Sequence, residues 1–333
     1  MTVPEVPGTS PPLVRGVIFS RDRAMQLDAA LASFSSHCAE AGSIPIDVLY
    51  AASSPAFARQ YEVLEKRWRS GLRLRFHRER DFRADLLGIL GAEQQVSRGF
   101  LRHPSHLLGI LPRGGRSPRE TKGTAPCVLF LVDDNIFCRP FSVVPATRAL
   151  DARPQAIGFS LRLGLNTTYC YALDSQQRVP QLAAIGDGVF AFDWTSAECD
   201  FGYPLEVSSS IYRGPQVARV LDGLRFSNPS TLEGSLAEGA RRSWARRSPE
   251  LLCFEQSVTF CNAVNKVQTV CDNRAGEEDE LSARELAKRF DAGLRIDTRA
   301  FAGFTPNACH CDVRFSFVPD EADASGRDPN TQA

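Results

Sequence analysis

The feature that constrains the fold most is a short apolar run that stops abruptly at acidic residues. Residues 128–132 are all apolar, and Asp133, Asp134 and Asn135 follow at once. A β-branched and aromatic run of this length is typical of a strand buried on both faces, as in a parallel sheet covered by helices. Apolar residues resume at Ile136, so this acidic triplet interrupts a core element.

Two interpretations of the acidic triplet are open from its residues alone. Ligands of open α/β sheets bind at the carboxyl ends of the strands, where these side chains would lie. Two carboxylates and an amide offer the hard oxygen ligands that Mg²⁺ or Mn²⁺ takes alongside substrate phosphates. Aspartate and asparagine also close turns, so a plain turn would use the same residues. The rest of the chain has to decide between a metal site and a turn.

Hydrophobic periodicity predicts that strands and helices alternate before the triplet. The predicted strands are 13–20, 46–51 and 72–77, and the predicted helices begin near Met25 and span 57–70 and 83–101. Short connections between such elements indicate a parallel sheet, in which the acidic strand is the fourth. We therefore predict an α/β fold with a Rossmann-like, mostly parallel sheet flanked by helices.

The second half of the chain predicts a more irregular mixture of elements within the same domain. Helices are expected at 143–152, 215–223, 229–246 and 281–290, and strands at 156–161, 188–193, 205–212 and 314–318. We predict one domain over 13–318 with an elaborated C-terminal half. A Pro-rich lead (1–12), a Pro-, Gly-, Arg- and Ser-rich insertion (102–124) and a polar tail (319–333) are predicted to be disordered.

Charge and cysteine content narrow the class of protein. Lys plus Arg and Asp plus Glu both number 39, so the totals give no reason to expect nucleic acid or an anionic membrane as a partner. The sequence contains no apolar stretch of about 20 residues and no signal-peptide pattern at its start. We therefore expect a cytoplasmic protein whose ten cysteines are thiols. The cluster Cys309-His310-Cys311 lacks a matching second pair, so a structural zinc site is not favoured.

Several familiar signatures are missing from the sequence. The chain has no Gly-x-x-x-x-Gly-Lys-Ser/Thr loop and no Gly-x-Ser-x-Gly elbow. Ser20, Arg21, Asp22 and Arg23 follow the first predicted strand in place of a Gly-x-Gly-x-x-Gly turn. These observations argue against a P-loop nucleotidase, an α/β-hydrolase and a Rossmann dehydrogenase.

The remaining pattern resembles the GT-A type glycosyltransferases, which use nucleotide sugars and carry a metal-binding DxD-type motif. Residues 17–23 resemble their opening strand and nucleotide-contacting tip, and 130–137 resemble their acidic strand end. Polar segments at 228–234, 262–268 and 307–310 resemble bacterial glycosyltransferase-like proteins. The resemblance spans about 14–318 and departs at Asn135, where many of these enzymes have a second carboxylate.

The resemblance implies a nucleotide-binding half over about 13–140 and an acceptor half over about 141–318. It implies a metal-dependent transfer of sugar from a nucleotide diphosphate donor, with Mn²⁺ or Mg²⁺ as cofactor. The acceptor, a glycan, a lipid or a small molecule, is not defined. The implied metal ligands are Asp133, Asp134, Asn135 and His310. The implied nucleotide-sugar contacts are Ser20, Arg21, Asp22, Arg23, Asp133 and Asn166, the last from an aromatic and hydroxyl-rich run (159–171) that can alternatively be an ordinary loop.

An inverting transferase also needs a carboxylate as general base towards the acceptor hydroxyl. The candidates are Glu233, Glu206 and Asp187, and we favour Glu233 because it lies in the segment 228–234. The alternative for Glu233 is a solvated helix residue. Two other functions remain open: a nucleotidyltransferase, disfavoured because no Gly-rich, Lys-containing loop follows the first strand, and a catalytically silent binding protein, suggested by Asn135.

Overall fold

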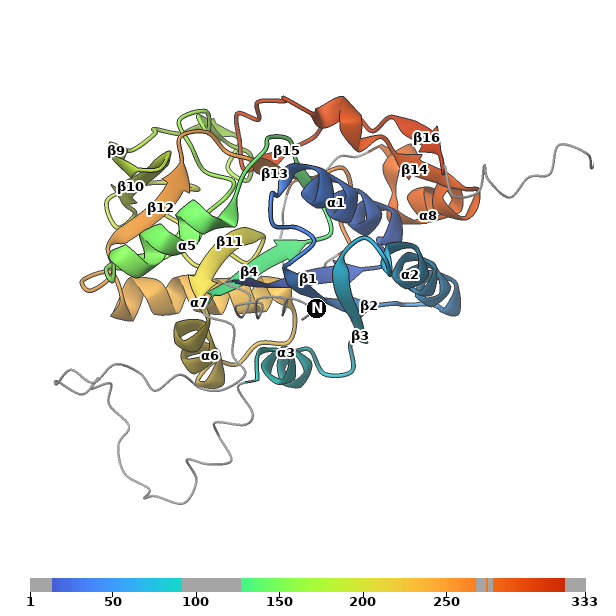
Figure 1. The fold of residues 1–333 in the computed structure, drawn as a ribbon, viewed down its shortest axis with the longest axis horizontal. Coiled ribbons are helices and arrows are strands. Elements are labelled where there is room, and N and C mark those ends of the chain that lie inside the picture. Colours follow the sequence, from blue (N-terminus) through green and yellow to red (C-terminus); the bar gives the residue numbers. More distant parts are fainter. Residues whose placement is uncertain (1–13, 92–126, 268–273, 275–277, 321–333) are drawn as a thin grey trace, which may run out of the picture.

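The computed structural model describes residues 14–91, 127–267, 274 and 278–320, and its centre is a nine-stranded sheet (Figure 1). The strand order is β3-β2-β1-β4-β11-β6-β12-β10-β9. The first four strands in chain order are parallel and alternate with helices, as predicted. They are β1 (Val14–Arg21), α1 (Ala24–His37), β2 (Pro45–Ala51), α2 (Pro55–Trp68), β3 (Arg73–Arg78), α3 (Phe82–Leu90) and β4 (Cys127–Val132).

Strand β4 is apolar throughout because the two faces of the sheet bury alternate residues. Leu129 and Leu131 pack into the core that contains α1, α2 and α5 (Val143–Ala152). Val128 and Phe130 pack into the opposite core, which contains α3, α6 (Gly214–Asp222) and α7 (Pro229–Ser243). Figure 1 shows these two sets of helices on opposite sides of the sheet. This confirms the prediction of a strand buried on both faces.

The second half of the chain extends the sheet with strands of both directions. Strand β11 (Ser209–Arg213) lies between β4 and β6 (Ala156–Ser160) and is antiparallel to both. As a consequence β4 and β6 run in the same direction, and β12 (Glu250–Phe254) runs parallel to β6. The outer strands β10 (Val189–Asp193) and β9 (Ala183–Gly186) form an antiparallel hairpin. The carboxyl ends of β1, β4, β6 and β12 therefore meet at one edge.

Smaller elements cover this edge. A three-stranded sheet joins β5 (Asn135–Phe137), β13 (Thr259–Asn262) and β15 (His310–Cys311). Two-stranded sheets pair β7 (Tyr169–Cys170) with β8 (Ser175–Gln176), and β14 (Leu294–Ile296) with β16 (Phe317–Pro319). The remaining helices are η1 (Asp279–Leu281), α8 (Ala283–Asp291) and η2 (Thr298–Phe301). In the described part of the chain, no helix is long and apolar enough to cross a membrane.

An ion-pair network ties the C-terminal segment to the N-terminal half. Asp28 on α1 lies 3.2 Å from Arg67 Nε and 3.5 Å from Arg295 Nε. Asp320 pairs with Arg295 Nη2 at 2.7 Å and also with Arg67. Asp320 is buried, so the folded domain extends beyond the predicted boundary at residue 318.

Some predicted boundaries were wrong. Helix α3 ends at Leu90, where Gly91 adopts the left-handed conformation that commonly ends helices. Residues 92–101 of the predicted helix lie outside the described residues. The predicted strand 205–212 begins only at Ser209, because Leu205 has a positive φ. Helix α7 ends at Ser243, and the last predicted strand shifts to β16. The predicted lead, the insertion at 102–124 and residues 321–333 of the tail lie outside the described residues.

Helix α7 begins with a capping box that should contribute measurably to stability. The Asn228 side chain accepts a hydrogen bond from Thr231 N at 2.9 Å, and Thr231 Oγ1 accepts one from Asn228 N at 3.1 Å. We predict that Asn228→Ala lowers the free energy of unfolding by about 1 kcal/mol, the usual cost of losing such a cap. Urea unfolding measures this, with Ser230→Ala, which lies outside the box, as the control. An unchanged midpoint would contradict the prediction.

Candidate functional site

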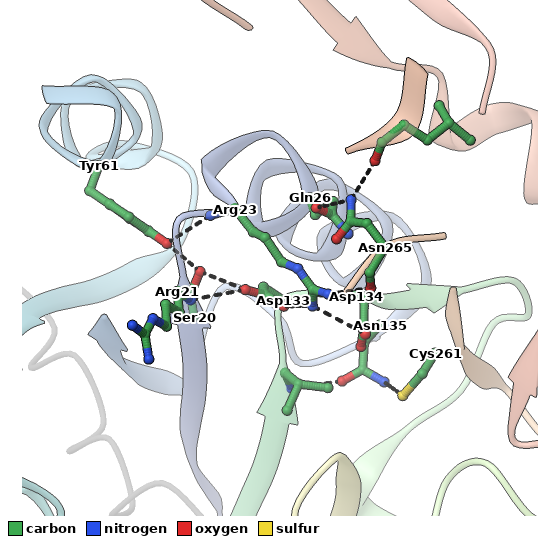
Figure 2. Close-up of polar contacts among 12 residues, drawn as sticks. Ser20, Arg21, Arg23, Gln26, Tyr61, Asp133, Asp134, Asn135, Cys261 and Asn265 are labelled. Atoms are coloured by element: carbon green, nitrogen blue, oxygen red, sulfur yellow. Dashed lines mark hydrogen bonds and ion pairs between the residues drawn. The ribbon is translucent and has the colours of Figure 1, made fainter. Parts of the chain in front are cut away.

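The carboxyl edge of the sheet carries two adjoining clusters of charged residues. The first cluster comprises Arg23, Asp133 and Asp134, together with their neighbours on β1 and β13 (Figure 2). Asp133 and Asp134 form the turn between β4 and β5, and Asn135 begins β5. The turn interpretation is therefore correct for the triplet, and its predicted position at the carboxyl end of the strand is confirmed, whereas the metal site remains a prediction.

Hydrogen bonds of Asp133 connect the end of β4 to the end of β1. Its Oδ2 accepts hydrogen bonds from Ser20 Oγ at 2.9 Å and from Arg21 N at 3.2 Å. Its Oδ1 accepts one from Arg23 Nη1 at 3.0 Å, and its own N–H donates to Phe19 O at 3.1 Å. The two motifs that are 110 residues apart in the sequence are thus one structural unit.

Arg23 is the cation of the first cluster. Its Nη1 also lies 3.5 Å from Asp134 Oδ2, and its Nη2 donates to the carbonyl of Asn265 at 2.5 Å. Burial alone would lower the pKa of Arg23, but the charges of Asp133 and Asp134 outweigh burial and raise it. Arg23 is therefore a fixed positive charge shared by two carboxylates.

Asp134 is the less satisfied of the two carboxylates. Its Oδ1 is buried and has no hydrogen-bond partner among the described residues. Burial raises the pKa of Asp134, the charge of Arg23 lowers it and the charge of Asp133 raises it, and together these effects place it at about 6. A buried carboxylate oxygen without a partner can accept a cation or a proton.

Asn135 has a structural task that explains why it is not a carboxylate. Its Oδ1 accepts a hydrogen bond from Val132 N at 2.9 Å, which closes the turn, and its Nδ2 contacts Cys261 Sγ at 3.5 Å. The side chain is fully buried. A cation would have to replace the Val132 hydrogen bond to reach this oxygen, so Asp133 and Asp134 are the better oxygen donors.

The other residues of the β1 tip are held in different ways. Ser20 Oγ also contacts Tyr61 OH at 2.7 Å, and this phenol accepts a hydrogen bond from Arg23 N at 3.2 Å. Asp22 has a positive φ of 55° and accepts a hydrogen bond from Ser53 N at 2.7 Å. The Arg21 side chain is exposed. Arg21 is thus free to contact a ligand, whereas Asp22 joins the ends of β1 and β2.

His310 on β15 is in register with Asn135 on β5, and strand β13 lies between them. Cys261 on β13 pairs with Asn135 on one side and with His310 on the other. Burial, with the charge of Arg162, lowers the pKa of His310 to about 3, so its imidazole is neutral. Among the described residues, no group of three His, Cys, Asp or Glu side chains is arranged to hold a metal. The metal role of His310 remains a prediction.

The second cluster contains both predicted catalytic glutamates. Glu206 is buried, and its carboxylate accepts hydrogen bonds from Ser209 N at 3.1 Å, from Ser208 N and from Ser210 Oγ. These bonds hold the turn that leads into β11. Glu206 is therefore engaged in local structure, and its oxygens are less available for proton transfer.

Glu233 is not a solvated helix residue. It lies in the first turns of α7, and its Oε2 accepts a hydrogen bond from Val207 N at 3.0 Å. Burial raises the pKa of Glu233; the charge of Glu206 raises it further, whereas Arg162 lowers it. A carboxylate with a raised pKa at this edge has the properties of a general base.

Sequence reasoning missed Arg162, the buried cation between these glutamates. It lies two residues after β6, with Nη2 at 3.6 Å from Glu206 Oε2 and Nη1 at 3.4 Å from Ser208 Oγ. Its side chain is 5% exposed, so little water screens its charge. Asp200 is a further missed acid, whose pKa burial raises and Arg162 lowers. The available signal was an arginine just past a buried strand, as at Arg21 and Arg23.

Of the two remaining candidates, Asn166 is engaged in other hydrogen bonds and Asp187 lies away from both clusters. Asn166 donates from Nδ2 to Ser257 Oγ at 2.7 Å and to Pro306 O at 2.5 Å, which uses both of its N–H groups. A nucleotide-sugar contact through Asn166 would have to replace these bonds. Asp187 is exposed in the turn between β9 and β10, in the outer hairpin of the sheet.

The first cluster fits a divalent cation held jointly with a ligand. Mg²⁺ and Mn²⁺ take carboxylate oxygens, and Mg²⁺ is commonly bound through one or two carboxylates plus substrate phosphates. Asp133 and Asp134 supply two such carboxylates, and Asp134 Oδ1 is without a partner among the described residues. Arg23 already offsets part of their charge. The donor set therefore suits a cation that arrives with an anionic ligand.

A glycosyltransferase is among the proteins with a sequence similar to this chain. Over 285 residues the chain is 21% identical to the bifunctional glycosyltransferase pgtA of Dictyostelium discoideum. The aligned region covers 78% of this chain and 33% of that protein, so the chain spans about a third of the relative's length. No protein-family model matches the chain.

Three solved structures show partial similarity. The crystal structure of S. aureus TarS has a TM-score of 0.41 at 10% identity, covering 75% of this chain and 37% of that one. Its fragment 1–349 has a TM-score of 0.40 at 11% identity, covering 75% and 60%. Apo mouse xyloside xylosyltransferase 1 has a TM-score of 0.30 at 11% identity, covering 70% and 83%.

The charges of the second cluster predict that the loss of stability caused by Arg162→Met depends on pH. Without this cation the pKa of Glu233, already raised, rises further. An acid with a higher pKa in the folded than in the unfolded protein destabilises the fold above its folded pKa, but not below its unfolded value of about 4.3. We predict a loss of about 3 kcal/mol near pH 7.5, typical of a broken buried pair, that shrinks towards pH 4.5.

Urea unfolding across this pH range measures the effect. Arg219→Met, at an exposed position on α6, is the control and should change stability little at any pH. A loss of the same size at pH 4.5 and pH 7.5 would show that Arg162 stabilises by packing and not by charge.

Proposed function

We propose that this chain is a GT-A type glycosyltransferase that moves a sugar from a nucleotide diphosphate donor to an acceptor hydroxyl. The observation that carries the proposal is the set of hydrogen bonds from Ser20, Arg21 and Arg23 to Asp133. They bring a polar strand tip and an acidic turn together at the ligand-binding edge of an α/β sheet. The sequence similarity to a bifunctional glycosyltransferase supports this choice over a nucleotidyltransferase.

In this proposal Asp133 and Asp134 hold Mn²⁺ or Mg²⁺ together with the donor diphosphate. When bound, such a cation neutralises the negative charge that grows on the leaving diphosphate as the sugar–phosphate bond breaks. The Arg23 guanidinium pairs with Asp133, and Arg21, whose backbone N–H bonds to Asp133, has an exposed side chain. Guanidinium groups match phosphate oxygens in charge and geometry. We assign both arginines to the diphosphate.

Glu233 is the proposed general base. The second cluster lies at the same edge of the sheet as the first, because Arg162 follows β6, the acidic turn follows β4, and these two strands run in the same direction. A hydroxyl of the acceptor would lose its proton to Glu233 as the new glycosidic bond forms, which is the requirement of an inverting reaction. Glu206 is the less suitable base because its carboxylate already accepts three hydrogen bonds. The acceptor is a glycan, a lipid or a small molecule.

Ligand binding tests the metal part of the proposal. We predict that a nucleoside diphosphate such as UDP or GDP raises the melting temperature when Mn²⁺ or Mg²⁺ is present and not when a chelator is present. Asp134→Ala should abolish the increase, because it removes a carboxylate that holds the cation. Asp151→Ala, at an exposed position on α5, is the control. Equal stabilisation in chelator would rule out metal-dependent donor binding.

Removing the proposed base should separate catalysis from binding. We predict that Glu233→Gln lowers the rate of sugar transfer by about 100-fold or more, the usual contribution of a general base. Donor binding, followed by the thermal shift with Mn²⁺, should be unchanged because Glu233 does not belong to the first cluster. Glu238→Gln, exposed on the same helix, is the matched control. Retained transfer in Glu233→Gln would assign the base to another carboxylate.

A further inference from the structure

We infer that in the ligand-free protein the Arg23 guanidinium occupies the position beside Asp133 and Asp134 that the divalent cation takes later. When the donor diphosphate binds, the guanidinium leaves this position and the cation enters it. The inference rests on the proposed function, because it concerns the same pair of carboxylates. It adds an order to ligand binding: Mn²⁺ or Mg²⁺ binds weakly by itself and enters with the nucleotide.

The first reason is the position of the Arg23 guanidinium. One nitrogen, Nη1, lies 3.0 Å from Asp133 Oδ1 and 3.5 Å from Asp134 Oδ2. The three side chains are 9%, 5% and 17% exposed, so little water screens their charges. A divalent ion that bound both carboxylates would lie next to this guanidinium, and like charges at this distance repel strongly where water is excluded. Arg23 and a cation therefore compete for Asp133 and Asp134.

The second reason is that the ligand-free arrangement leaves buried polar atoms unsatisfied. Arg23 Nε and Asp134 Oδ1 have no hydrogen-bond partner among the described residues. Beside them, Asn265 donates to Gln26 Oε1 at 3.3 Å, yet Asn265 Oδ1 and Gln26 Nε2 are also without partners in this part of the structure (Figure 2). Unpaired buried donors and acceptors are unfavourable, so a ligand that satisfies them favours another arrangement.

The third reason is that the donor diphosphate offers Arg23 a better partner. A guanidinium forms paired hydrogen bonds with phosphate oxygens, whereas here its contact with Asp134 is long. Arg23 is also the residue before α1, and α1 has no side-chain cap at its N-terminus. Helix N-termini attract phosphate groups. A diphosphate at the β1 tip would therefore draw the guanidinium away from the carboxylates and leave them for the cation.

Direct measurement of Mn²⁺ binding tests this order without any need for catalysis. Electron paramagnetic resonance of free Mn²⁺ gives its Kd for the wild type and for Arg23→Met, with and without UDP, GDP, ADP or CDP, each tested singly. Arg21→Met is the matched control, because it removes an exposed neighbouring charge and leaves the Arg21 N–H bond to Asp133 intact.

We expect Arg23→Met to bind Mn²⁺ alone about tenfold more tightly than the wild type, within the usual range of coupling between sites. For Mn²⁺ alone, without a nucleotide, Arg21→Met should resemble the wild type. A nucleoside diphosphate should tighten Mn²⁺ binding in the wild type by more than in Arg23→Met, because the variant has no guanidinium to displace.

The contrary results are distinct. Equal Kd values for Mn²⁺ alone in the wild type and Arg23→Met would overturn the inference, while sugar transfer could still be measured and the proposed function kept. If Arg23→Met does not fold, the wild type decides: a Kd for Mn²⁺ unaffected by every nucleotide would overturn the inference. Absence of Mn²⁺ binding under all conditions would overturn the proposed metal site as well.

Discussion

The hydrogen bonds from the β1 tip to Asp133 are the interaction on which the rest of the site depends. They fix the end of β4 against the end of β1, and Arg23 then extends the connection to Asp134 and to the Asn265 carbonyl. Because β1 and β4 are adjacent parallel strands, their carboxyl ends present these side chains at one edge. A buried cation shared by two carboxylates is costly to assemble unless each member is held by further contacts. Tyr61 supplies such contacts through Ser20 Oγ and Arg23 N.

The sheet topology explains how a second cluster comes to adjoin the first. Strand β11 enters antiparallel between β4 and β6, so the turn that holds Glu206 lies beside the residues that follow β4 and β6. Arg162 then lies between segments far apart in the sequence, with Glu206 before β11 and Glu233 on α7. The same edge thus offers a pair of carboxylates suited to a cation and a carboxylate with a raised pKa. The proposed sugar transfer from a nucleotide diphosphate donor to a hydroxyl would use both kinds of group.

Much of the N-terminal half could be predicted from sequence because its signals are local. The continuous apolar run of β4 follows from burial between two helical layers, and the helical spacing of α1 follows from burial in one of the two cores. The acidic turn could be predicted too, because carboxylates directly after a buried run must lie where the strand leaves the core. The role of Asn135 could not be predicted from the sequence, because its hydrogen bond with Val132 N depends on the turn geometry. The sequence did not predict the role of Arg162 or the hydrogen bond from Arg23 to the Asn265 carbonyl. These contacts link residues that are 46 and 242 positions apart in the sequence.

The proposed function requires that this edge of the sheet cleave a nucleotide sugar. The most direct measurement is release of nucleoside diphosphate from a panel of nucleotide sugars in the presence of Mn²⁺, with wild type and Asp133→Ala compared. We expect Mn²⁺-dependent release from at least one donor by the wild type and none above background by Asp133→Ala. Release by both proteins alike, or from no donor whatever the acceptor supplied, would contradict the proposed function.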